Sequence, residues 1–211
     1  MAGLFITFEG IEGTGKSTQA RLLAQALKKK GYRVVLTREP GGTRLADRIR
    51  HLLLDRCHQG MSPLTELFLY EASRVVHVAE TVRPALQRGA IVLCDRFTDA
   101  TIAYQGYGRG LSLSLLKTLN QKATKNLQPD LTILLDCPPI RGLKRARGRN
   151  RRTLTCQDRF ERESLLFHRR VRQGYLKLMR QNKKRFIKIN ALLPIQKTHQ
   201  QILKKVEGYL S

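Results

Sequence analysis

Short apolar runs alternate along the chain with longer segments in which apolar residues recur every three or four positions. A run of about four to eight mostly apolar residues, without polar alternation, is typical of a strand buried on both faces of a sheet. Runs of this kind predict five strands, at residues 4–9, 33–37, 90–95, 131–136 and 186–190.

The segments between these strands carry helical signals. Gly31 stands where a helix beginning at Lys16 would be capped, and Ser62 followed by Pro63 is typical of an N-cap and a first helical position. Further helices are expected at residues 45–54, up to residue 87, and at 194–210. Strands joined by crossover helices imply an α/β fold with a parallel sheet covered on both faces, and we expect one domain over residues 1–211.

The turn after the first predicted strand reads GIEGTGKS, from Gly10 to Ser17, and fits the pattern G-x-x-x-x-G-K-[ST]. Glycines let successive backbone N–H groups point inward, and the following helix contributes the positive end of its dipole. Lys16 would reach the β- and γ-phosphates of a nucleoside triphosphate, and the Ser17 hydroxyl would bind Mg²⁺. The candidate ATP-binding residues are Gly10, Ile11, Glu12, Gly13, Thr14, Gly15, Lys16, Ser17 and Thr18.

Composition narrows the possible functions. The net charge of +24 would attract polyanions, and residues 141–185 hold 17 Lys or Arg against 3 Asp or Glu. This basic segment lacks interleaved aromatic residues for base stacking, so nucleic acid is not expected as the substrate. A GTPase is disfavoured because the nearest string to N-K-x-D is NKKR, at residues 182–185.

The sequence shows neither a membrane-spanning segment nor a targeting segment, and this indicates where in the cell the protein is expected. The chain has no apolar run of about 18 residues and no basic leader at its N-terminus, so we expect a cytoplasmic protein without a membrane partner. Four cysteines form no C-x-x-C pair and five histidines show no metal-binding spacing, so free thiols and no zinc site are expected.

With a GTPase and a nucleic-acid enzyme both disfavoured, a small-molecule kinase is the remaining class of P-loop protein. TREPGGT follows the second predicted strand, CDRF follows the third, and AYQGYGRG comes shortly after. Ligands of open α/β sheets gather beyond the carboxyl ends of the strands, so Arg38, Asp95 and Arg96 should lie near the glycine turn. Two arginines beside a phosphate cradle indicate a second phosphate, that of an acceptor.

The ordered set FEGIEGTGKST, TREPGGT, DRF, AYQGYGRG and DRFERE resembles the bacterial thymidylate kinase family. The resemblance runs from Leu4 to about Leu178. It implies a P-loop nucleoside monophosphate kinase fold with a five-stranded parallel sheet in the order 2-3-1-4-5, a lid, and a homodimer. The implied reaction transfers the γ-phosphoryl group of ATP to dTMP, giving dTDP. Another nucleoside monophosphate kinase of this fold, or a nucleotide-dependent nucleic-acid-binding protein, is the alternative.

The resemblance also assigns roles, and several positions keep a simpler interpretation. Glu12 could face outward, Arg38 could pair only with Glu39, Tyr70 could be plain core with Phe68 as the rival aromatic, and Gln105 could be a helix-surface residue. The implied dTMP-binding residues are Glu12, Arg38, Tyr70, Arg74, Arg96, Thr101, Tyr104 and Gln105. Ser17 and Asp95 are the implied metal-associated residues, with Mg²⁺ as the cofactor.

The basic segment at residues 144–163 is expected to form a mobile loop, with the lid at about 145–157. The phosphate loop has no arginine between Gly10 and Lys16, which in the resembled family accompanies a lid that supplies the catalytic arginine. The implied catalytic residues are Lys16, Arg96, Arg147 and Arg149, with Arg145 and Arg151 as rivals. The acceptor is already charged, so catalysis should need alignment and charge stabilisation rather than a general base.

Overall fold

The computed structural model describes residues 3–153 and 158–210, with side chains at 151–153 left aside. Its sheet has five parallel strands in the order β2-β3-β1-β4-β5, as predicted. The strands are β1 (Leu4–Glu9), β2 (Val34–Arg38), β3 (Ile91–Asp95), β4 (Leu131–Asp136) and β5 (Phe186–Asn190). The second strand lies one residue later than predicted at both ends, which moves Arg38 from the turn onto the last position of β2, and the third strand begins one residue later than predicted.

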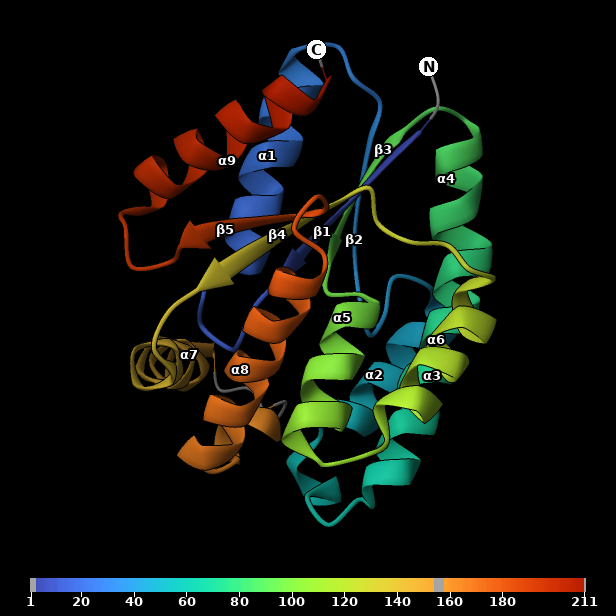
Figure 1. The fold of residues 1–211 in the computed structure, drawn as a ribbon, viewed down its shortest axis with the longest axis vertical. Coiled ribbons are helices and arrows are strands. Elements are labelled where there is room, and N and C mark those ends of the chain that lie inside the picture. The colour runs from blue at the N-terminus through green and yellow to red at the C-terminus, as the bar shows by residue number, and fades with distance from the viewer. Residues whose placement is uncertain (1–2, 154–157, 211) are drawn as a thin grey trace.

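Helices lie on both faces of the sheet (Figure 1). The helix α1 (Lys16–Lys29) packs beside α9 (Ile195–Leu210). The remaining elements are α2 (Arg44–Leu54), η1 (Arg56–His58), α3 (Pro63–His77), η2 (Val78–Val82), α4 (Arg83–Gln87), α5 (Thr98–Thr101), η3 (Ile102–Gly108), α6 (Leu113–Thr124), α7 (Pro139–Thr153), η4 (Phe160–Arg162) and α8 (Leu165–Gln181). Ser62 caps α3 by accepting a hydrogen bond from the Thr65 N–H, as the sequence predicts.

The core joins the sheet to these helices. Phe8, Leu23 and Ile133 are fully buried on β1, α1 and β4, while Phe5 and Phe97 belong to a second buried cluster. Apolar residues that recur at helical spacing on α8 are buried too. The strands are therefore held in place by the packed core, which fixes the positions of the turns that follow their carboxyl ends.

The segment expected to be a mobile loop is different in the structure. Residues 144–153 continue α7, and η4 covers Phe160–Arg162. The loop expectation was wrong for these residues because Leu, Ala, Lys and Arg are strong helix formers and because Leu143 and Ala146 are buried three residues apart. Residues 154–157, the end of the expected lid, lie outside the described residues.

Candidate active site

The glycine turn between β1 and α1 forms an open cradle. Gly10, Gly13 and Gly15 have φ angles of 137°, 71° and 91°, a region that residues with a Cβ rarely adopt. Among the described residues, no side chain caps the N-terminus of α1, and its first turn has no acidic residue. The backbone N–H groups of this helix end are therefore available to an anion.

Helix α7 packs directly against this turn. A Cβ on Gly13 would lie 1.9 Å from the Gly142 carbonyl oxygen, and a Cβ on Gly142 would lie 2.5 Å from the Glu12 carbonyl oxygen. The two glycines thus allow two backbones to touch, which couples the position of α7 to the shape of the cradle.

Lys16 folds back over the turn. Its Nζ donates a hydrogen bond to the Ile11 carbonyl oxygen at 2.8 Å, and its side chain is buried. Burial, aided by the nearby charge of Arg96, lowers the pKa of Lys16 to about 8. An anion in the cradle would stabilise the charged form of this ammonium group. Ile11 is buried in the core, so only its backbone can serve a ligand.

Ser17 and Asp95 meet between α1 and the end of β3. The Ser17 hydroxyl donates a hydrogen bond to Oδ2 of Asp95. Hydroxyl and carboxylate oxygens are the ligands that Mg²⁺ prefers, usually with water and phosphate oxygens completing the shell. The pair fits a magnesium site beside the cradle.

Arg96 connects the cradle to the acceptor side. Its backbone has a φ of 73°, in the left-handed region that residues other than glycine rarely adopt. The guanidinium donates hydrogen bonds to the Gly10 carbonyl oxygen, to Oε1 of Glu12 and to the hydroxyls of Tyr104 and Tyr175, at 3.0–3.2 Å. Arg96 therefore stands at the junction of the two halves of the site.

Glu12 faces inward, contrary to the simpler interpretation. It accepts a hydrogen bond from the Tyr104 hydroxyl at 2.6 Å, and its Oε2 lies 3.2 Å from Nδ1 of His168. Burial would raise the pKa of Glu12, but His168, Arg96 and Lys16 outweigh it and hold the pKa well below its ordinary value. The carboxylate is thus an ionised wall of the cleft.

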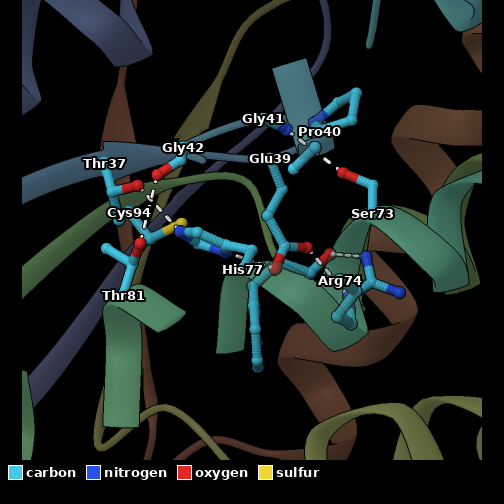
Figure 2. Close-up of polar contacts among 12 residues, drawn as sticks. Thr37, Glu39, Pro40, Gly41, Gly42, Ser73, Arg74, His77, Thr81 and Cys94 are labelled. Atoms are coloured by element: carbon cyan, nitrogen blue, oxygen red, sulfur yellow. Dashed lines mark hydrogen bonds and ion pairs between the residues drawn. The ribbon is translucent and has the colours of Figure 1, made fainter. Parts of the chain in front are cut away.

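The TREPGGT turn is supported from below by α3 (Figure 2). His77 contacts the Thr37 hydroxyl at 2.7 Å through Nε2 and Oε1 of Glu39 at 2.9 Å through Nδ1. Arg74 donates to Oε2 of Glu39 at 2.8 Å, and the Gly41 N–H donates to the Ser73 hydroxyl. A buried polar network thus fixes the turn that carries Arg38.

A cleft opens between this turn, the phosphate loop and η3. The cavity that it encloses has a volume of about 190 Å³. Thirteen of the predicted site residues line it: Glu12, Gly13, Lys16, Ser17, Arg38, Tyr70, Arg74, Asp95, Arg96, Thr101, Tyr104, Gln105 and Arg149. Within the described part of the chain, the predicted residues Gly10, Ile11, Thr14, Gly15, Thr18 and Arg147 are not part of this lining.

The acceptor side of the cleft carries several guanidinium groups. Arg38 is 54% exposed at its side chain and pairs with Asp47 at 3.0 Å, rather than with Glu39. Arg50, which sequence analysis missed, donates to the Pro40 carbonyl oxygen, and burial together with repulsion from Arg38 lowers its pKa. The mutual repulsion of Arg38 and Arg50 favours the binding of an anion between the two guanidinium groups.

Arg74 is placed differently from the other arginines. It is almost fully buried, and its guanidinium donates hydrogen bonds to Glu39, Glu71, the Asn120 amide oxygen and the Phe97 carbonyl oxygen. These bonds satisfy much of its donor capacity within the protein. Its contribution to the site is first to hold the wall of the cleft.

The aromatic wall is formed by Tyr70 and Phe160, whose ring centroids are 6.3 Å apart. Tyr70 is also partly packed against the core, so it both lines the cleft and contacts the core. Phe68 is 54% exposed and lies outside the described lining of the cleft, which removes it as the rival aromatic. Phe160, which is buried in the core, also lines the cleft.

The candidate lid arginines differ in their contacts. Arg149 lines the cleft and pairs with Oε1 of Glu161 at 3.2 Å. Arg147 donates two hydrogen bonds to the Glu161 carbonyl oxygen, and Arg145 donates to the Ala191 carbonyl oxygen at 2.6 Å. The side chain of Arg151 lies outside the described residues.

Three buried residues of the site were missed by sequence analysis. His168 lies against Glu12, Tyr175 donates a hydrogen bond to Oε2 of Glu9 at 2.7 Å, and Glu66 contacts Gln105. The helical spacing of Tyr175 with its apolar neighbours predicts only burial and carries no information about its hydroxyl. The only signal in the sequence was a polar residue at a position where the helical pattern predicts burial. This signal does not indicate which residue the polar group contacts.

A phosphate cradle that shares one cleft with a cationic acceptor pocket defines a P-loop phosphotransferase. Residues 8–202 match the family model for thymidylate kinase. The chain belongs to the thymidylate kinase family.

Known thymidylate kinases are similar to this chain over most or all of its length. A thymidylate kinase of Geotalea daltonii is 54% identical over 211 residues, covering 99% of each chain. One of Geobacter sulfurreducens is 59% identical over 177 residues, covering 83% of each. The crystal structure of thymidylate kinase from Ehrlichia chaffeensis matches with a TM-score of 0.79 and 36% identity, covering 98% of this chain and 99% of that one.

Among residues 3–153 and 158–210, no helix is long and apolar enough to cross a membrane.

Proposed function

We propose that this protein transfers the γ-phosphoryl group of ATP to dTMP, giving ADP and dTDP. The carrying observation is the shared cleft: Lys16 and Asp95 line it from the donor side and Arg38 from the acceptor side, with Arg96 bonded to both the phosphate loop and Tyr104. Donor and acceptor phosphates can then meet end to end, which supplies the alignment on which phosphoryl transfer depends.

The donor half binds the triphosphate through backbone N–H groups and two side chains. Lys16 neutralises the β- and γ-oxygens, and Ser17 with Asp95 would hold Mg²⁺. When bound there, Mg²⁺ would supply positive charge that neutralises phosphate oxygens. The proposed ATP-binding residues are Gly10, Ile11, Glu12, Gly13, Thr14, Gly15, Lys16, Ser17 and Thr18.

The acceptor half holds the phosphate of dTMP with Arg38 and Arg96, and the position of Arg50 supports a third contact. Tyr70 stacks on the base. The proposed remaining contacts to dTMP are Glu12, Arg74, Thr101, Tyr104 and Gln105. A phosphate monoester carries about −1.5 to −2 charges near neutral pH, so the attacking oxygen needs no protein base.

The helix α7 and the residues after it supply the lid, at about 145–157 within one domain. Arg149 is favoured over Arg147 as the lid arginine because it already lines the cleft, whereas Arg147 is tied to a backbone carbonyl. An arginine finger of this kind stabilises charge on the migrating group and contributes about 10³–10⁵ in rate in related enzymes.

A panel of acceptors tests this function. With ATP and Mg²⁺, dTMP should show a kcat/KM at least about 100-fold above those of AMP, GMP and CMP, because one shaped base pocket must discriminate between rings of different size and polarity. Steady-state rates of ADP formation measure it. A better purine acceptor would assign the protein to another nucleoside monophosphate kinase activity.

We also propose that the enzyme is a homodimer. Leu64, Phe68 and Val75 on α3 are 45%, 54% and 48% exposed. At 100° per residue they lie within about 40° of one another on the helix surface. An exposed apolar stripe of this kind is typical of a protein contact surface.

A further inference from the structure

Glu66 on α3 is a fully buried carboxylate that contacts Gln105, a residue lining the cleft. Arg109 contacts both of its oxygens, with Nε 3.2 Å from Oε1 and Nη2 3.1 Å from Oε2. Nη1 of Arg159 lies 2.7 Å from Oε2. Two guanidinium groups therefore compensate the buried charge, and both hold the carboxylate in one orientation.

Gln105 on η3 is the residue that Glu66 orients. Its Nε2 donates a hydrogen bond to Oε1 of Glu66 at 2.7 Å. A carboxylate has only acceptor atoms, so the carboxamide must turn its NH₂ group toward Glu66. Gln105 lines the cleft, and within the described residues no hydrogen bond to its Oε1 is present. The atom left for a ligand is thus an acceptor.

Bases differ in what they offer to an acceptor. Thymine and uracil carry a donor, N3–H, between two carbonyl oxygens, whereas cytosine has a lone pair at N3 and an amino group at C4. Thr101 also lines the cleft, and its buried hydroxyl has no partner within the described residues. A hydroxyl rotates to donate or accept, so Thr101 suits either base and cannot discriminate.

We propose that Glu66 is a specificity-determining positioning residue: it fixes the Gln105 carboxamide with its oxygen toward N3 of the base, so that thymine and uracil are accepted and cytosine is rejected. This inference rests on the proposed function. If the Gln105 oxygen faced position 4 of the base, it would repel the O4 carbonyl of thymine. A thymidylate kinase must bind thymine, so the partner of this oxygen is the N3–H group. With cytosine, two lone pairs would face each other in a dry pocket.

Glu66→Gln tests the orientation. The oxygen of the new carboxamide should stay with Arg109 and Arg159, which leaves its NH₂ group facing Gln105. Gln105 must then turn its own NH₂ group into the cleft. We expect the ratio of kcat/KM for dTMP over dCMP to fall at least about tenfold, the equivalent of one exchanged hydrogen bond.

The matched control is Glu163→Gln, because Glu163 also pairs with Arg109, at 2.7 Å, and has no bond to Gln105 among the described residues. Its dTMP to dCMP ratio should stay at the wild-type value. The ratio of dTMP to dUMP should be unchanged in both variants, since both bases carry N3–H. A Glu66→Gln enzyme that phosphorylates dTMP with the wild-type dTMP to dCMP ratio would overturn the inference while leaving the proposed function intact.

Because Glu66→Gln could unfold the protein, the wild-type enzyme provides a second measurement. The monophosphate of N3-methyl-2′-deoxyuridine keeps both ring carbonyl groups of dUMP but has no N3–H to donate. We expect its kcat/KM to be at least about tenfold below that of dUMP. Equal values for the two acceptors would overturn the inference, and failure of the wild type to prefer dTMP over purine acceptors would instead overturn the proposed function.

Discussion

Glu9 and Glu12 lie three residues apart, and their surroundings move their pKa values in opposite directions. Burial, reinforced by the charge of Asp99, raises the pKa of Glu9 to about 8. The same carboxyl group at Glu12 is held in its ionised form by His168, Arg96 and Lys16 despite burial. One residue type thus serves as a neutral structural group at the end of β1 and as a charged wall of the cleft.

Glu9→Gln should change how stability depends on pH. The pKa of Glu9 is about 8 in the folded protein against 4.5 ordinarily, so its stabilising contribution is full below pH 4.5 and is lost as pH rises toward 8. Between pH 5 and 8 the free energy of unfolding of the wild type should therefore decrease as Glu9 ionises. Glutamine cannot ionise, so the decrease in the variant should be smaller by about 1–3 kcal/mol. Urea unfolding at several pH values measures it.

The control for this comparison is Glu207→Gln, a partly exposed carboxylate on α9. It should leave the slope of stability against pH at the wild-type value. Parallel slopes for wild type and Glu9→Gln would contradict the assignment of a neutral Glu9.

At the scale of elements, the turn at residues 39–42 and the end of α3 act as one unit. A Cβ on Gly42 would lie 2.7 Å from Cδ2 of His77 and 2.5 Å from the Thr37 hydroxyl oxygen. The turn therefore rests directly on the His77 ring (Figure 2). Any change in that ring should be transmitted to Arg38, which immediately precedes the turn.

His77→Phe should impair the acceptor side selectively. Phenylalanine fills the volume but removes the contacts to Thr37 and Glu39, which leaves buried polar groups unpaired. We expect the KM for dTMP to rise about tenfold while the KM for ATP stays within about twofold, since the phosphate loop is untouched. His199→Phe on α9 is the control. An equal rise in both KM values would show a general loss of structure instead.

The elements themselves differ in how well the sequence predicted them. All five strands and the cap at Ser62 were predicted, because apolar periodicity and capping chemistry are local properties. The region at 144–153 was mistaken for a loop because its charge suggested mobility, whereas its helix propensity and its packing on Gly13 decided the outcome.

At the scale of the whole molecule, the apolar stripe on α3 gives a test of the proposed dimer. Phe68→Lys would place a charge at its centre, and the molecular mass in solution should fall from that of two chains to that of one at micromolar concentration. Sedimentation velocity measures it. The control is Leu166→Lys, at an equally exposed apolar residue on α8. If both variants sediment like the wild type, the α3 stripe is not the contact surface.

The sequence by itself determined the strand order through the resemblance it carries, the phosphate loop, and most residues that line the cleft, because these follow from local spacing and from the rule that parallel strands end at one edge. Only the tertiary structure decided which polar and charged groups are paired: Arg74 with Glu39, Glu12 with His168, and Gln105 with Glu66. These partners are between 35 and 156 residues apart in the chain. The free energy of a buried charge depends on such neighbours, and neighbours exist only once the chain has folded.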